Sequence, residues 1–348
     1  MKIKPVGLVY SSVKAVGEQH EWCVCIHAAK VINKFRISDV VSGNFQHLKV
    51  VTICHNLGNV NKHSYNLMAY PDNAIHLQKQ TSFKFDIRSL IIFLLTGALA
   101  WAINLAPQMG FGGSITNFWM RTTFILVADA LLLLVTFHLF KRNSIPTTAL
   151  GLNVTKRLYK NALIGMGIAI ATIITMAIML YLFVPYRFLY KSLNVGYVLK
   201  ESYSFLLGAL LEEMLFRGFL LVFFSKLLGW RIGLLILALP FGLYHLAGGI
   251  TLVTSTTMFS FVFGLSFVLT GSLWTAIFVH ATANILLHAI TGLDGGGNSV
   301  YTLAFEGQIP NYPFGLLVSV SSALIMASVL YLVIVRRQRI KIDTPNHQ

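Results

Sequence analysis

The sequence is poor in charged residues, and acidic side chains are the scarcest. Only 11% of its 348 residues are charged, with 12 Asp and Glu against 27 Lys and Arg. Hydrophobic residues make up 55% of the chain, and the mean hydropathy is +0.69. A soluble globular protein needs more charge than this on its surface. The composition therefore excludes that class and predicts a membrane protein.

Cysteine is also rare. Cys23, Cys25 and Cys54 are odd in number and lie outside the long apolar runs, so they indicate no disulfide framework. Together with His27, the first two look like half of a metal cluster, but the second pair of ligands that a zinc site needs is missing. We interpret these cysteines as free thiols.

Apolar runs of spanning length recur from about residue 90. A membrane span needs about 20 apolar residues, and fewer suffice inside a bundle. We therefore predict an all-α fold, a polytopic membrane helix bundle with about eight transmembrane helices. The expected spans are 87–106, 118–140, 161–184, 203–224, 232–247, 252–270, 273–290 and 313–335.

The net charge of +15 comes mostly from basic residues at the ends of the expected spans, so it does not indicate a nucleic-acid partner. Basic clusters follow the second, fourth and eighth expected spans, whereas the loops 107–117 and 291–312 carry no basic residue. By the positive-inside rule this predicts an integral protein of a bacterial-type plasma membrane with both termini cytoplasmic. Arg187, Lys191 and Lys200, in the third outer loop, are the exception.

The chain divides into segments of different character. We expect a polar extension over 1–82, amino-terminal membrane helices over 83–198, a core over 199–292, an outer loop and last helix over 293–340, and a tail over 341–348. The extension has neither helix nor strand periodicity and no apolar core of a signal peptide. It is either a small cytoplasmic extension or translated upstream sequence before a start nearer Met68, and we favour the second.

Three polar clusters interrupt successive apolar segments. They are Glu212-Glu213-x-x-x-Arg217, Phe241-x-x-x-His245 and His280-x-x-x-Asn284. Ionisable groups at membrane depth are costly and occur mainly where they line a pathway or do chemistry. Residues four apart share a helix face, so we expect Glu213 to pair with Arg217 and Glu212 to face a pocket.

Together these residue types supply what peptide-bond hydrolysis requires. A carboxylate can take a proton from water, and a histidine can share that water or protonate the leaving amine. A further histidine and an asparagine can donate hydrogen bonds to the oxyanion. The candidate catalytic residues are therefore Glu212, His245, His280 and Asn284.

At these three motifs the sequence resembles the CPBP/Abi intramembrane endopeptidases, a family that includes the type 2 CAAX prenyl endopeptidase and lysostaphin-resistance-like and bacteriocin-immunity proteins. The resemblance covers about residues 200–290, and Leu150-Gly151-Leu152 matches a further family feature. It implies a glutamate-dependent endopeptidase that acts on a peptide or membrane-associated protein, in CAAX-type processing or in bacteriocin processing or self-immunity.

The resemblance also implies a role for each residue. Glu212 with His245 would activate the attacking water, and His280 with Asn284 would stabilise the oxyanion. Glu213 and Arg217 would hold the geometry, and Phe241 would form a wall.

A metal is the alternative for this residue set. Glu212, His245 and His280 could bind a divalent ion such as zinc, but the H-E-x-x-H helix of zincins is absent. We favour no metal and no other cofactor.

Other functions stay open at this point. A proton-coupled transporter could use the same carboxylates and histidines as a relay, although no inverted copy of the motif is present. A catalytically silent immunity or scaffold protein could keep the cluster as buried structural ion pairs. Asp129, inside another apolar run, is expected to pair with Arg121 two turns earlier or with a neighbouring helix.

Overall fold

A computed structural model describes residues 26–29, 50–53, 86–105, 118–152, 156–293, 298–306 and 314–343. The chain forms two compact units, 1–68 and 69–348. In the first, β1 (Ile26–Ala29) and β2 (Val50–Ile53) pair antiparallel, with Ile26 opposite Ile53. The sequence predicted no strand here. The candidate thiols at 23, 25 and 54 lie outside the described residues.

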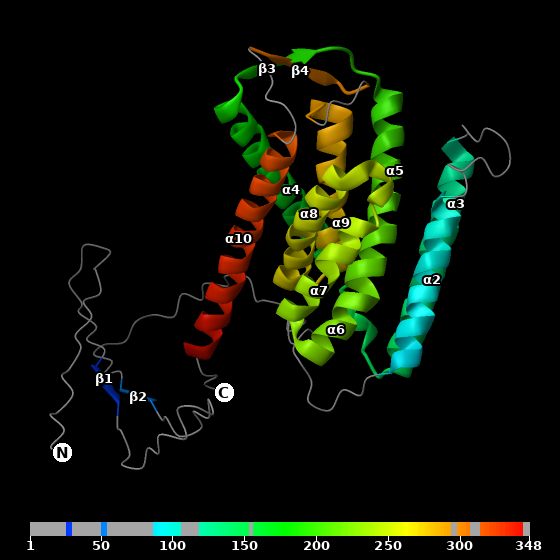
Figure 1. Cartoon of the computed structure of the whole chain (residues 1–348). Helices are drawn as coiled ribbons and strands as arrows, with labels where there is room; N and C mark the ends of the chain where they lie inside the picture. The colour runs from blue at the N-terminus through cyan, green and yellow to red at the C-terminus, as the bar shows by residue number, and fades with distance from the viewer. Residues whose placement is uncertain are drawn as a thin grey trace. The chain divides into compact units, whose positions relative to one another are not determined.

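The second unit is a helix bundle, and each of the eight expected spans is helical. The all-α polytopic membrane fold is thereby confirmed (Figure 1). The helices are α2 (Ile87–Leu105), α3 (Phe118–Arg142), α4 (Lys156–Phe183), α5 (Val195–Glu213), η3 (Met214–Leu220), α6 (Leu221–Leu228), α7 (Trp230–Leu243), α8 (Gly249–Thr270), α9 (Leu273–Asn284), η5 (Ile285–Thr291) and α10 (Phe314–Asp343). The segments η3 and η5 are π-helical and continue α5 and α9 without a break.

Six helices in the described part of the chain are long and apolar enough to cross a membrane. These are α2, α3, α4, α8, α9 with η5, and α10. The other two expected spans are the charged and π-interrupted run from α5 to α6, and α7, which has 14 residues. Large side chains such as Leu95, Leu134, Leu163 and Leu332 are about two-thirds exposed on the outer helices, as a lipid-facing surface requires.

The expected fifth span, 232–247, is wrong at its end. Helix α7 stops at Leu243, and His245 lies in the turn before a short 3-10 helix, η4 (Leu246–Gly248). Gly249 has φ +81°, a conformation that favours glycine and that lets α8 start in a new direction. His245 therefore stands at a helix end rather than inside a span.

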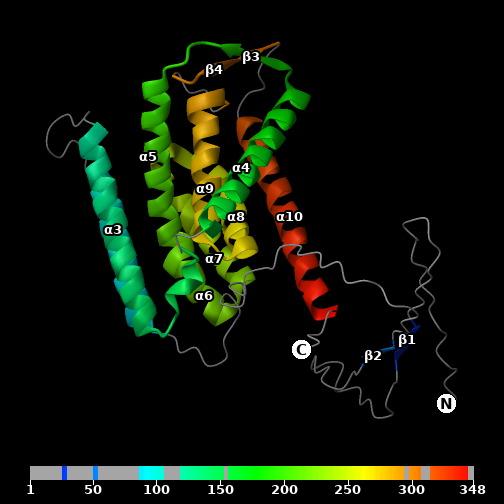
Figure 2. The ribbon, with the colours of Figure 1, turned by 180° about the vertical axis from the view of Figure 1, so that it is seen from behind.

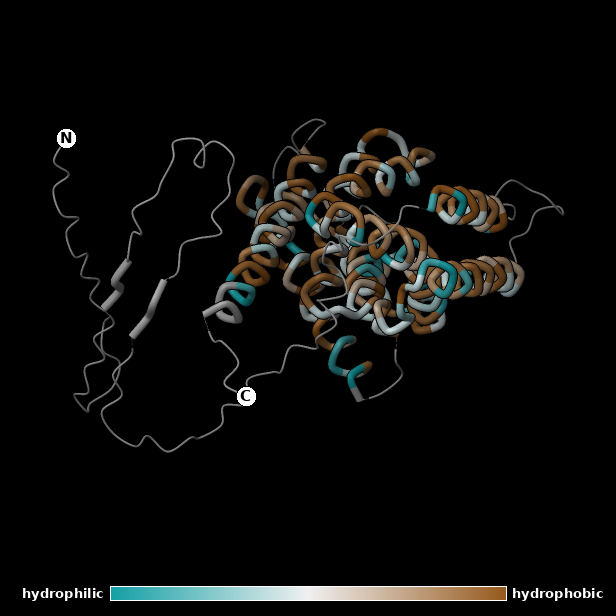
Figure 3. Tube along the Cα trace, turned by 90° about the horizontal axis from the view of Figure 1, so that it is seen from below, coloured by the Kyte–Doolittle hydropathy of each residue, from teal (hydrophilic) through white to brown (hydrophobic). Residues whose placement is uncertain are grey.

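Helix α9 and the segment η3 lie inside the bundle, and α5 runs beside α9 (Figures 1 and 2). Helix α9 packs against α4, α5 and α8, and α8 also packs against α7 and α10. Helices α2 and α3 pair with each other, and α3 packs against α5 and η3. Figure 3 shows hydrophobic residues along most of each helix, with hydrophilic ones confined to a few positions.

A small sheet stands where two loops were expected. Strand β3 (Tyr186–Tyr190) pairs antiparallel with β4 (Tyr301–Phe305) at one end of the bundle (Figure 1). Aromatic residues alternate along β3 and stabilise the pairing of the two strands. Tyr186 packs against Phe305, and Tyr190 packs against Tyr301, in cross-strand aromatic pairs. Arg187, one of the basic exceptions in the third outer loop, lies 3.6 Å from Glu306.

The Leu150-Gly151-Leu152 feature locks the turn between α8 and α9. Gly151 has φ +60°, and a Cβ atom there would collide with the Gly271 carbonyl oxygen. The Ser272 hydroxyl donates to the Gly151 carbonyl oxygen at 2.9 Å. Only glycine allows this close approach, which sets the position of α9.

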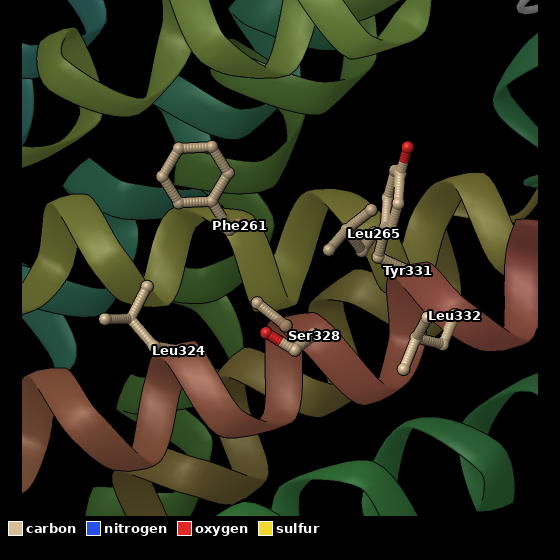
Figure 4. Close-up of a pocket in the computed structure, with 7 residues that line it drawn as sticks. Phe261, Leu265, Leu324, Ser328, Tyr331 and Leu332 are labelled. Carbon is tan, nitrogen blue, oxygen red and sulfur yellow. The ribbon is translucent and has the colours of Figure 1, made fainter.

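A shallow apolar groove of about 450 Å³ opens between α8 and α10 (Figure 4). It is lined by Phe261, Leu265, Leu324, Ala327, Ser328, Tyr331 and Leu332. None of the candidate catalytic residues lines it, so the chemistry belongs elsewhere.

Candidate active site

Glu213 and Arg217 form the buried base of the site. The Arg217 Nη1 donates to Glu213 Oε1 at 3.1 Å, and both side chains are almost completely buried. The predicted pair is therefore confirmed. The Arg217 Nη2 also donates to the carbonyl oxygen and the hydroxyl of Ser260, each at 2.9 Å. The sequence analysis did not predict Ser260. The only hint in the sequence is a polar residue between the aromatic residues of α8.

Aromatic rings pack against Arg217 and against His280. The Arg217 guanidinium lies 4.2 Å from the centre of the Phe241 ring, a cation–π contact. Phe263 stacks on His280 with ring centres 4.4 Å apart and planes within 11°. Phe241 is thus a wall of the site, as predicted, and Phe263, which was not predicted, is a second.

His245 is oriented by a backbone carbonyl group in the last turn of α7. Its Nδ1 lies 3.0 Å from the Phe241 carbonyl oxygen. A carbonyl oxygen only accepts hydrogen bonds, so Nδ1 carries the hydrogen and donates it. In the neutral ring Nε2 is then a free base, and it lies 3.4 Å from Glu212 Oε2.

His280 is oriented in the same way by Glu213. Its Nδ1 lies 3.0 Å from Glu213 Oε1, and its Nε2 lies 3.8 Å from Glu212 Oε2. Both imidazoles are therefore held at Nδ1 and turn Nε2 toward the same carboxylate oxygen. An ordered acceptor at the far ring nitrogen fixes the tautomer and orientation of a histidine.

Glu212 Oε2 is the point where the site converges. It has no hydrogen-bond partner among the described residues. The side chains of Glu212 and His245 are 16% and 19% exposed, whereas His280 is 6% exposed. The oxygen Oε2 itself is buried, and only small parts of the Glu212 and His245 side chains reach the surface of the bundle.

Asn284 is the one predicted site residue without a contact to the cluster among the described interactions, and its role stays a prediction. It is the last residue of α9, half-buried, one turn beyond His280. Within the described residues, no hydrogen bond joins its side chain to Glu212 or to either histidine. The structure brings the other six predicted residues together, from α5, η3, α7 and its following turn, and α9.

The alternative metal set was Glu212, His245 and His280. In the described part of the chain, no group of three His, Cys, Asp or Glu side chains is arranged to hold a metal ion. The expectation of a site without metal stays a prediction.

Fold and site together define an integral membrane helix bundle with a buried cluster of acid, histidine and arginine side chains. Residues 194–286 match the family model described as type II CAAX prenyl endopeptidase Rce1-like. This range holds all three motifs, and the match confirms the resemblance inferred from them. Comparisons with curated proteins and with solved structures found no match.

Proposed function

We propose that this protein is an intramembrane endopeptidase in which Glu212 is the general base. The observation that carries this proposal is the convergence of two imidazole Nε2 atoms, at 3.4 and 3.8 Å, on one unbonded oxygen of Glu212. The family match over residues 194–286 supports a CAAX-type activity at the level of the family.

The reaction is hydrolysis of a peptide bond. Glu212 takes a proton from a water molecule while the water oxygen attacks the substrate carbonyl carbon. The C–N bond then breaks, and the proton passes from Glu212 or His245 to the leaving amine. With Nδ1 donating to Glu213, a doubly protonated His280 could also donate from Nε2 to the carbonyl oxygen and stabilise its developing negative charge. Glu213, Arg217 and Ser260 position these groups without touching the substrate.

The test replaces the acid and the histidine with matched controls. Glu212→Gln keeps the shape of the side chain but removes the base, so we expect the rate of peptide cleavage to fall by a factor of about 10² or more. His245→Ala should give a comparable loss. The controls are Glu201→Gln, on the same helix three turns earlier, and His138→Ala, an exposed histidine on α3. Both controls should cut like the parent, and a chelator should leave the parent rate unchanged.

Parent-like cleavage by Glu212→Gln in purified, folded protein would refute the mechanism. A transporter would instead show proton-linked flux in liposomes, and a scaffold would keep its biological effect with Glu212→Gln. For substrates we propose prenylated CAAX peptides first and bacteriocin precursor or self-immunity peptides second, with the protein in its bilayer or in detergent.

A further inference from the structure

Asp129 is a buried carboxyl group that the proposed chemistry does not use. It lies in α3, only 6% exposed, and neither of its oxygens has a hydrogen-bond partner among the described residues. The expected ion pair between Asp129 and Arg121 is not formed. Arg121 lies on the exposed side of α3, whereas Asp129 is buried. A buried carboxyl group without a partner is costly and calls for an explanation.

Asp129 lies at the depth of the candidate active site. Helix α3 begins beside Tyr203, in the first half of α5, where the Phe118 and Tyr203 rings are 6.2 Å apart, and near its end the Phe140 ring lies 6.1 Å from the Phe219 ring of η3. The two helices therefore run in the same direction. At a rise of about 1.5 Å per residue, Asp129 lies roughly 16 Å along α3 from Phe118, and Glu212 lies roughly 14 Å along α5 from Tyr203. The two carboxyl groups are therefore at a similar depth.

Tyr244 lies between α2 and the candidate active site. Its ring lies 6.3 Å from the Trp101 ring of α2, and its hydroxyl is hydrogen-bonded to the Asn104 side chain of the same helix. Its ring meets the His245 ring edge-on, with centres 5.4 Å apart. Asn104 and Tyr244 are half-buried, whereas both Asp129 oxygens are buried, so a ligand would have to enter past the half-buried side chains to reach the carboxyl group.

We propose that Asp129, Asn104 and Tyr244 form a substrate-binding subsite beside Glu212, in which the Asp129 carboxyl group accepts a hydrogen bond from a donor group of the peptide substrate. A lysine ammonium group or a backbone N–H has the required chemistry. This inference rests on the proposed endopeptidase function and adds a preference for donor groups near the cleaved bond.

A subsite of this kind has a distinctive cost in the free protein. A carboxyl group that waits for a ligand destabilises the unliganded fold, whereas a structural carboxyl group stabilises it. Asp129→Leu should therefore raise the melting temperature of the free protein by a few degrees. Asp129→Asn keeps an acceptor oxygen and should bind substrate better than Asp129→Leu.

The experiment uses purified full-length protein and fluorescence-quenched farnesylated CAAX peptides in pairs. The members of a pair differ only by lysine or norleucine at one position, and each position is varied in turn. For one position we expect Asp129→Leu to raise KM for the lysine peptide about tenfold or more, since a charge-assisted hydrogen bond is lost. The kcat, and the KM of the norleucine peptide, should change less than about twofold.

Thr136→Val is the matched control. Thr136 lies on the same face of α3 two turns later, fully buried, with a hydroxyl group that has no partner among the described residues. Its removal should leave the discrimination between lysine and norleucine unchanged.

Two results would overturn the inference. One is unchanged discrimination in Asp129→Leu at every position. The other is a lower melting temperature with an equal loss of kcat on all peptides, as a structural role predicts. If the parent cleaves none of these peptides, the CAAX substrate class is wrong. The same peptide pairs are then measured by fluorescence anisotropy, and equal binding to the parent and Asp129→Leu would overturn the subsite itself.

Discussion

Two buried carboxyl groups at one depth of the bundle have opposite surroundings. Glu213, on α5, accepts with its Oε1 from Arg217 at 3.1 Å and from His280 at 3.0 Å. Asp129, on the neighbouring α3, has no such partner among the described residues. Burial alone therefore does not tell what a membrane carboxyl group does. A compensated group holds other side chains in place, whereas an uncompensated one lowers the stability of the free protein and calls for another explanation.

The strongest way to break this contrast is to make Glu213 resemble Asp129. Arg217→Leu leaves a fully buried carboxylate without its cation and frees the Ser260 contacts. We expect the free energy of unfolding to fall by about 3–5 kcal/mol, the usual cost of stranding one member of a buried pair. Denaturation of the purified protein in detergent, followed by tryptophan fluorescence, measures this loss.

The control removes both members of the pair. Glu213→Met with Arg217→Met replaces the ion pair by apolar side chains of similar length, so much of the lost stability should return. A double variant as unstable as Arg217→Leu would mean that the arginine acts through its aromatic contacts and not through Glu213.

The converse change gives Asp129 a partner. Leu133 is half-buried one turn after Asp129, and an acid followed four residues later by a lysine is the favourable order on a helix. Leu133→Lys should occupy the carboxyl group and lower the preference for lysine peptides about threefold to tenfold, with kcat unchanged. Leu133→Met, which has no charge, should keep the preference of the parent. Equal effects of both substitutions would show that packing, and not the carboxyl group, sets the preference.

The smallest effect is expected at a carboxyl group that is paired but accessible to solvent. Asp86 caps α2: it accepts from the Arg88 backbone N–H at 3.1 Å and from the Ser89 hydroxyl, and Arg142 lies 3.0 Å away. The Ser89 hydrogen bond, with help from Arg142, lowers the pKa of Asp86 from 3.8 to about 2. Asp86→Asn should lower the melting temperature by only about 1 °C at neutral pH, because exposed pairs contribute little.

The pH dependence of that effect has a definite sign. A lowered carboxyl pKa adds stability that is complete above the unfolded value and disappears as the pH falls through the folded value. The difference between parent and Asp86→Asn should therefore vanish between pH 3.8 and about pH 2. A difference that persists below this window would assign the effect to the geometry of the helix cap.

Much of the fold is readable from the sequence because apolar length is a strong signal. Each expected span corresponds to a helix, and α2 differs from its expected range by one residue. The π-helical segments leave no such signal, since their backbone depends on packing with neighbouring helices. The β3–β4 pair joins segments more than 100 residues apart, and its alternation of aromatic residues is short enough to be taken for a loop.

The site was predictable where spacing on a helix decides the contact. The Glu213–Arg217 pair follows from four-residue spacing alone. Ser260 and Phe263 were not predictable, because their contacts depend on how α8 lies against η3 and α9. For Asp129 the sequence predicted a pairing, but a residue's partner across helices depends on rotation about the helix axis, which periodicity does not fix.

The π-helical turn just after Glu213 has a consequence for how chain length can vary. Loss of a single codon between Gly218 and Leu220 would let the segment close into an ordinary α-helix while the spacing of Glu213 and Arg217 stays intact. Helix α6 would keep its orientation, because the π turn already holds one residue more than an α-helical turn, whereas a deletion within an ordinary α-helix turns everything after it by about 100°. A one-residue deletion between Glu213 and Arg217 would break the spacing of the ion pair, whereas a deletion in the rest of the π turn would change neither the pair nor the direction of α6.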